Sequence, residues 1–156
     1  MPTARAQAFL DHWMLHRRAL ERLAERLPAS AADFQPWDGA MTTARLLDHI
    51  SGSGTRFARA VQRGAFGERP APTSGPVALA DAVGRLKAST QEITEVVSGL
   101  SDAQLDALID FGPTGKMPAH ALLGLMIDHE IHHKGQMFTY ARICGVEPPG
   151  FVQRPA

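Results

Sequence analysis

The chain of 156 residues has the length of one domain and can bury a hydrophobic core without disulfides or a structural metal. Its 16 lysines and arginines balance 16 acidic residues, which argues against binding to the phosphate backbone of nucleic acids. Cys144 is the only cysteine, so an internal disulfide is excluded, and no apolar run approaches the ~18 residues of a membrane span. We therefore expect one cytoplasmic domain over residues 1–156, with neither nucleic acid nor membrane as a partner.

The first two predicted elements are long amphipathic helices. Apolar residues recur at helical spacing over residues 4–27, and a proline follows directly. A second helix is expected over residues 42–65, with Thr42 or Thr43 as its N-cap. Two glycines weaken the middle of this second helix, which indicates close packing or space for a ligand.

The rest of the sequence alternates between irregular stretches and helical ones. Residues 64–76 are rich in glycine and proline and are expected to form a loop, which leads to a third helix over residues 76–100. Ser101 is expected to cap a short helical turn, and residues 110–118 are expected to be irregular. The fourth helix should extend over residues 118–145, which makes the predicted fold an all-α four-helix bundle.

Three of the seven histidines fall within five residues of one another in the fourth predicted helix, in the stretch DHEIHHKGQ. At about 100° per residue, His133 lies about 40° from His129, and Gln136 lies about 20° from it on the other side. The other residues of this face are apolar, so His129 and His133 are expected to point into the bundle. By the same measure, Glu130 and Lys134 turn toward solvent or a neighbouring helix.

Two imidazoles four residues apart on one helical face can bind the same metal ion, as in zinc and nickel sites. The alternative is a pair of core histidines, for which an apolar face offers few hydrogen-bond partners. A third ligand is available from His49 in the second predicted helix, where Gly52 leaves space one turn later. The alternative for His49 is a surface pair with Asp48.

The letters His129-Glu130-x-x-His133 are also those of zinc proteases, in which the glutamate is the general base. The extended form of that motif requires glycine and histidine at positions that Gln136 and Thr139 occupy here. No strand-like segment that could pair with an extended peptide is expected before the helix. The sequence therefore disfavours a protease.

The stretches LLDHISGS and DHEIHHKGQMFTYARICGVEPP resemble the DinB-like family of four-helix bundle proteins. The hallmark of that family is a histidine in the second helix and a His-x-x-x-His pair followed by Gly-Gln in the last. The resemblance implies an up-down-down-up bundle in which His49, His129 and His133 bind a divalent metal. Nickel and zinc are expected first, with iron and manganese as alternatives. The resemblance also implies a homodimer. It implies relatives that are transferases and isomerases dependent on low-molecular-weight thiols. The family name refers to induction by DNA damage.

These features predict a metal-dependent hydrolase or a thiol-dependent transferase in a stress response, in which the metal activates water or a thiol for a small-molecule substrate. Gln136 and His132 are candidates to support a ligand histidine, and Arg56 is a candidate to receive an anionic substrate group. The alternative function is a non-catalytic stress-response protein that binds a partner and holds a structural or vestigial metal.

Several other residues are expected to have structural roles. His12 and His16 are four residues apart without a third ligand in reach, so they are expected at the surface or in an interface. Trp13 and Trp37 are expected in the core or in dimer contacts. The alternative for Arg56 is a solvated helix face that it shares with other arginines. Those arginines are Arg59, Arg63 and Arg69.

Overall fold

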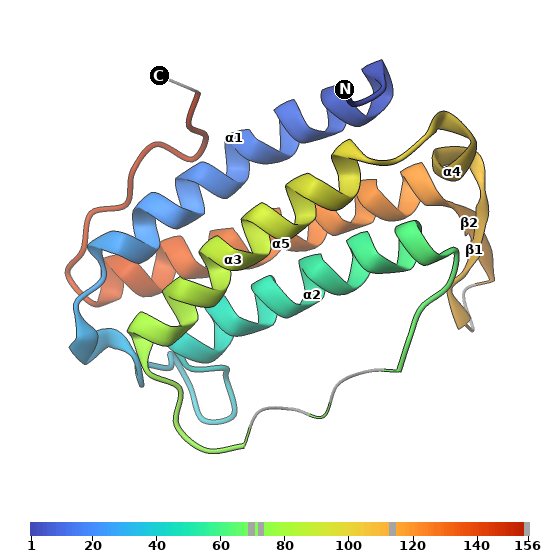
Figure 1. Ribbon diagram of the computed structural model, residues 1–156. Coiled ribbons are helices and arrows are strands. Elements are labelled where there is room, and N and C mark those ends of the chain that lie inside the picture. Colours follow the sequence, from blue (N-terminus) through green and yellow to red (C-terminus); the bar gives the residue numbers. More distant parts are fainter. Residues whose placement is uncertain (69–70, 72–73, 113–114, 155–156) are drawn as a thin grey trace.

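The computed structural model describes residues 1–68, 71, 74–112 and 115–154. Four long helices dominate this part of the chain (Figure 1). They are α1 (Ala4–Arg26), α2 (Thr43–Arg63), α3 (Leu79–Ser98) and α5 (Ala119–Ile143). The shorter elements are the 3-10 helix η1 (Ala29–Ala31), the helix α4 (Asp102–Asp106) and the strands β1 (Leu108–Asp110) and β2 (Lys116–Pro118). The predicted all-α four-helix bundle is confirmed.

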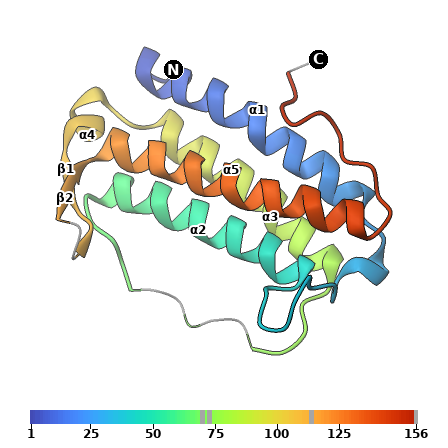
Figure 2. The same ribbon diagram turned by 180° about the vertical axis from the view of Figure 1, so that it is seen from behind.

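The long helices follow an up-down-down-up order. α1 and α5 run in one direction, and α2 and α3 run in the opposite direction (Figure 1, Figure 2). α2 packs against α3 and α5, and α1 packs against the same two helices, so α1 and α2 lie diagonally across the bundle. Because α2 and α3 are parallel, the predicted loop over residues 64–76 connects opposite ends of the bundle. Its residues 69–70 and 72–73 lie outside the described residues.

Local interactions fix three helix ends, and two of them, at Thr42 and Ser101, are the caps that the sequence predicts. The hydroxyl oxygen of Thr42 accepts a hydrogen bond from the backbone N–H of Arg45 at 3.4 Å. The C-cap of α2 is Gly64, whose φ of 80° is in the left-handed region that favours glycine. Ser101 begins α4 through a reciprocal capping box with Gln104. These ends depend on neighbours in sequence, which is why they could be predicted.

Two expectations about the connections are wrong. α3 begins at Leu79 rather than at residue 76, because the backbone is still extended at Ala78. The stretch over residues 110–118 is not wholly irregular, because β1 and β2 pair antiparallel with Ile109 opposite Met117. The side chain of Ile109 is fully buried and anchors this hairpin on the bundle. A strand-like segment therefore does precede α5.

The core extends along the bundle as two apolar clusters. Trp13 is fully buried in one of them, as predicted. Trp37 is 63% exposed, so the expectation of a core position is wrong and its role as a dimer contact stays a prediction. Leu122 and Met126 are buried on the predicted inward face of α5, but Leu125 on the same face is 36% exposed. None of the described helices is long and apolar enough to cross a membrane.

Candidate metal centre

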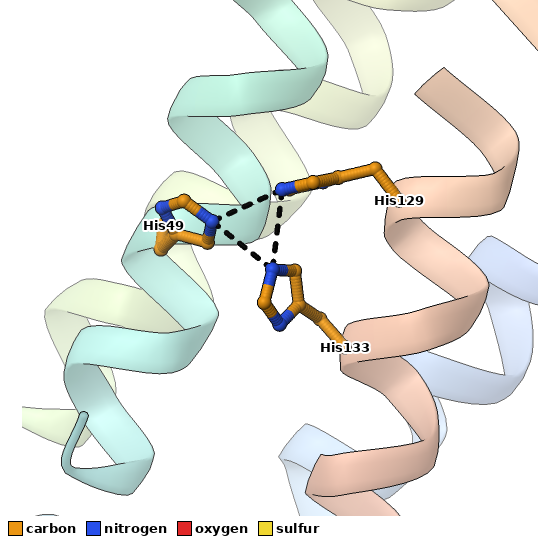
Figure 3. A group of neighbouring side chains, drawn as sticks. All are labelled: His49, His129 and His133. Carbon is orange, nitrogen blue, oxygen red and sulfur yellow. Dashed lines mark hydrogen bonds between the residues drawn. The ribbon is translucent and has the colours of Figure 1, made fainter. Parts of the chain in front are cut away.

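Three histidine side chains from two helices converge on one point between α2 and α5 (Figure 3). The Nε2 atom of His49 lies 3.0 Å from Nε2 of His129 and 3.1 Å from Nε2 of His133. The Nε2 atoms of His129 and His133 are 3.1 Å apart. The fold thus brings together the three residues that the sequence predicts as ligands, although 80 residues separate His49 from His129.

The donor atoms and their spacing fit a divalent metal ion. Histidine nitrogens bind zinc at about 2.0–2.1 Å, so the nitrogens around one ion are about 3 Å apart. Three mutually adjacent nitrogens cannot satisfy one another through linear hydrogen bonds, whereas one cation can accept a lone pair from each. His49 and His129 are partly exposed, so the cluster lies near the surface of the bundle.

The surroundings of the cluster favour neutral imidazoles, the form that binds metals. Burial, together with smaller contributions from His133 and His49, lowers the pKa of His129 to about 4. Burial also lowers the pKa of His133, although the hydrogen bond with Gln136 acts in the opposite direction. His129 and His133 are therefore uncharged at neutral pH, and no proton has to be removed from them before a metal binds.

Gln136 contacts His133 from the next turn of α5. Its Oε1 atom accepts a hydrogen bond from Nδ1 of His133 at 2.7 Å. A proton on Nδ1 leaves the lone pair of the neutral ring on Nε2, which is the atom that faces the other two histidines. This is the contact expected of a residue that orients a ligand histidine.

The other two candidate residues lie outside the histidine cluster. His132 is exposed on the flank, with its ring centroid 4.8 Å from that of His133. Arg56 stacks on Phe66, with Cζ 4.6 Å from the ring centroid. Arg56 also lines a cavity between α2 and α3 whose lining includes none of the three histidines. Gly52, which the sequence predicts to leave space beside His49, lines that cavity.

Glu130 faces α1 and is enclosed there. Its Oε1 accepts a hydrogen bond from Nε of Arg17 at 2.9 Å, and its Oε2 accepts from Nη2 of Arg17 at 2.6 Å. The indole N–H of Trp13 also donates to Oε2, at 2.9 Å. Glu130 is only 1% exposed and Arg17 is fully buried. Both carboxylate oxygens accept hydrogen bonds from residues of α1, so Glu130 cannot act as the general base of a zinc protease.

Lys134 and His16 form a second buried polar contact between α1 and α5. The Nζ atom of Lys134 lies 2.9 Å from Nδ1 of His16 and also donates to the carbonyl oxygen of Phe151. Burial is the main reason why the pKa values of Lys134 and His16 are both lowered. The expected surface position holds for His12, which is exposed, but is wrong for His16, which is 8% exposed.

An apolar wall lies beside the histidines, and no motif in the sequence indicates it. The ring centroid of Phe57 lies 6.4 Å from that of His129. The ring centroid of Phe66 lies 5.7 Å from that of Phe57 and 5.4 Å from that of Phe111. All three phenylalanines are partly exposed. They come from α2, from the segment after α2 and from the hairpin region, so only the folded chain brings them together.

The family model of the DinB superfamily matches residues 12–137 of the sequence. The chain belongs to the DinB superfamily. The resemblance found in the sequence is thereby confirmed at the level of the family. One superfamily relative is the protein named "Uncharacterized protein YjoA" of Bacillus subtilis (strain 168), which is 31% identical over 150 residues. The aligned region covers 93% of this chain and 95% of YjoA.

Solved structures of DinB-like proteins share the fold. The crystal structure of YjoA has a TM-score of 0.80 at 29% identity and covers 94% of this chain and 99% of its own. A DinB-like protein from Bacillus cereus ATCC 10987 has a TM-score of 0.78 at 22% identity, covering 92% and 95%. YfiT from Bacillus subtilis, described as "a probable metal-dependent hydrolase with an unusual four-helix bundle topology", has a TM-score of 0.72 at 16% identity, covering 94% and 91%.

Proposed function

We propose that this DinB superfamily protein binds one divalent metal ion through His49, His129 and His133 and uses it to act on a small molecule. The observation that carries the proposal is the convergence of three Nε2 atoms, 3.0–3.1 Å apart, where two of the rings are partly exposed. Three protein ligands leave a position for water or substrate, as in catalytic zinc sites. Nickel and zinc suit an all-imidazole donor set, and iron and manganese are the alternatives.

The proposed reaction is hydrolysis or thiol transfer. A divalent ion acts as a Lewis acid and lowers the pKa of a bound water or thiol. The protein supplies neutral ligand rings, and Gln136 keeps the proton of His133 on Nδ1. The description of YfiT as a probable metal-dependent hydrolase supports the first reaction through a shared fold. The resemblance to thiol-dependent relatives supports the second.

The surroundings of the cluster suggest the kind of substrate. The partly exposed wall of Phe57, Phe66 and Phe111 beside His129 favours a small molecule with an apolar part next to its reacting group. A low-molecular-weight thiol that carries such a part is our candidate. His132 is exposed next to His133, with the ring centroids 4.8 Å apart. We further propose a cytoplasmic homodimer that acts in a stress response, on the strength of the family resemblance and the single cysteine.

The metal content of the purified protein tests the ligand assignment. By elemental mass spectrometry, the wild type should carry about one divalent ion per chain, because three preorganised imidazoles bind such ions tightly. His49→Ala, His129→Ala and His133→Ala should each lose the ion. His12→Ala and His120→Ala are matched controls, because they remove histidines outside the cluster. Full metal content in the three cluster variants would overturn the assignment.

The alternative is a non-catalytic stress-response protein that binds a partner and holds a structural or vestigial metal. Structural zinc sites are closed by four protein ligands. The only group of three or more potential metal ligands in the described part of the chain has three histidines, and two of them are partly exposed. This exposure favours the enzyme over the alternative.

A further inference from the structure

A cavity of about 350 Å³ lies between α2 and α3, and its lining contains none of the three histidines. Its volume is within the range of about 300–1,000 Å³ that is typical of small-molecule sites. Four arginines line it, together with three acidic residues. The arginines are Arg56, Arg59, Arg63 and Arg85, and the acidic residues are Asp48, Glu68 and Glu92. The lining of the cavity therefore carries charged side chains of both signs.

The arginines of this cavity fall into two classes. Arg59 is paired with Glu92, and Arg85 is paired with Asp48, so these two have local counter-charges. Arg56 and Arg63 form no ion pair and no hydrogen bond through their side chains within residues 1–68, 71, 74–112 and 115–154. α2 carries four arginines and one aspartate, although the whole chain is neutral. By residue count the described lining carries one net positive charge, four arginines against three acidic residues. The expected fourth member of this face, Arg69, lies outside the described residues.

The side chain of Arg56 is held by stacking on a ring, but its hydrogen-bond donors are not all used. Its guanidinium is stacked on the ring of Phe66, with Cζ 4.6 Å from the centroid. Its Nε is a buried side-chain nitrogen that has no hydrogen-bond partner in the described chain. Buried N–H groups almost always have a partner, so the unpaired Nε of Arg56 is an exception within the described residues. The expectation of a solvated arginine therefore does not describe Arg56.

The backbone one turn before Arg56 makes room in front of it. Gly52 lies four residues earlier on α2 and lines the same cavity. A Cβ atom added at Gly52 would meet nothing within 4 Å, so the glycine leaves open space rather than allowing close packing. Gly54 differs, because a Cβ atom there would lie 3.0 Å from Cδ1 of Ile93. One of the two glycines of α2 thus serves packing, and the other opens the cavity.

We infer that the cavity between α2 and α3 binds a small organic anion through the guanidinium groups of Arg56 and Arg63. A planar guanidinium with several N–H donors binds phosphate and carboxylate groups, often through two hydrogen bonds at once. A molecule with one phosphate or carboxylate group fits both the charge and the volume of the cavity. This site is separate from the histidine cluster, and it does not depend on the proposed metal or reaction.

A titration followed by NMR tests the inference. The full-length protein is titrated with phenyl phosphate and, separately, with benzoate at constant ionic strength, and the Nε–H signals of the arginines are recorded. The expected result is a saturable shift of the Arg56 Nε–H signal with at least one of the two compounds. The compound that saturates at the lower concentration identifies the preferred anionic group. If neither compound gives a saturable shift of the Arg56 Nε–H signal, the inference is wrong.

Three variants and a control make the result specific. Arg56→Gln is expected to weaken binding about 10-fold or more, the size of one lost charged hydrogen bond. Arg63→Gln and Arg56→Lys should each weaken it to a smaller extent, and they keep the test decisive if Arg56→Gln does not fold. Arg142→Gln removes an exposed arginine at the end of α5 and should not change binding. Equal weakening by Arg142→Gln would show that only overall charge matters and would overturn the inference.

The histidine variants separate this site from the metal site. In His129→Ala, the anion should bind with wild-type affinity whether or not the metal is lost. Loss of anion binding in His129→Ala would show that the metal centre holds the anion, and the inference would be wrong. Retention of metal in that variant would contradict the proposed metal site without affecting the anion site.

Discussion

α5 carries two polar clusters on different faces, and they differ in how their hydrogen bonds are satisfied. Toward α1, both oxygens of Glu130 accept hydrogen bonds from Arg17. The remaining Nη1 of Arg17 donates to Ser89 and Thr90 of α3 at 2.8 Å and 3.1 Å. Toward α2, three histidine Nε2 atoms face one another in a triangle that hydrogen bonds alone cannot satisfy. A closed polar network indicates a structural role, whereas converging lone pairs indicate a ligand site.

Both clusters contain residues of one stretch, DHEIHHKGQ, whose polar residues are all of types that can take part in chemistry. Glu130 completes the letters of a protease motif, yet its carboxylate joins α1 to α5 and, through Arg17, to α3. Its neighbour His129 has a partly exposed ring in the histidine cluster. Direction around the helix, rather than residue type, separates the two roles.

The largest expected effect comes from opening the closed network. Glu130→Gln removes the charge that compensates the fully buried Arg17, and the free energy of unfolding should fall by about 3–5 kcal/mol. Chemical denaturation measures this loss. Glu95→Gln, at an exposed position of α3, is the control and should change stability by about 0.5 kcal/mol or less. A Glu130→Gln protein that is as stable as wild type would contradict the structural role.

An intermediate effect is expected from loosening the ligand site. Gln136→Ala removes the acceptor that holds the proton of His133 on Nδ1, and metal affinity should fall by about 10-fold to 100-fold. A competition titration with a chelator dye measures the affinity, and Gln62→Ala, at an exposed position of α2, is the matched control. Unchanged affinity in Gln136→Ala would show that the hydrogen bond does not orient the ligand.

The smallest expected effect is the pH dependence of the metal-free protein. The pKa of His129 is about 4 in the folded chain, against an ordinary value of 6.5. Between these values the unfolded chain binds a proton that the folded chain does not, so the free energy of unfolding should decrease as the pH falls from about 6.5 to about 4. Urea denaturation of wild type and His129→Ala over this range measures the effect. The variant should show the weaker dependence, and equal slopes would contradict the lowered pKa.

Much of the fold could be predicted because its signals are local. Thr42 and Gly64 mark the ends of α2, and Ser101 marks the start of α4, through contacts within a few residues. The sequence does not locate the start of α3, because a proline that can open a helix also fits the extended chain before one. The hairpin was missed because each strand has only three residues, and the buried side chain of Ile109 has no periodic pattern around it.

The histidine cluster could be anticipated in part, because angles around a helix follow from spacing alone. Those angles placed His129, His133 and Gln136 on one face. The angles could not identify the residue that packs against Glu130 on the adjoining face, because Arg17 lies 113 residues from Glu130 in the chain. They also could not show that Leu125 would be 36% exposed, because exposure depends on which helix covers each turn.

The coordination of the bound metal tests the central claim most directly. X-ray absorption spectroscopy of the metal-loaded protein should show three imidazole nitrogens at about 2.0–2.1 Å and at least one oxygen ligand from solvent. The three nitrogens would be those of His49, His129 and His133, and the oxygen would mark the position open to substrate. A sphere closed by four protein ligands, or one with fewer than three imidazoles, would contradict the account.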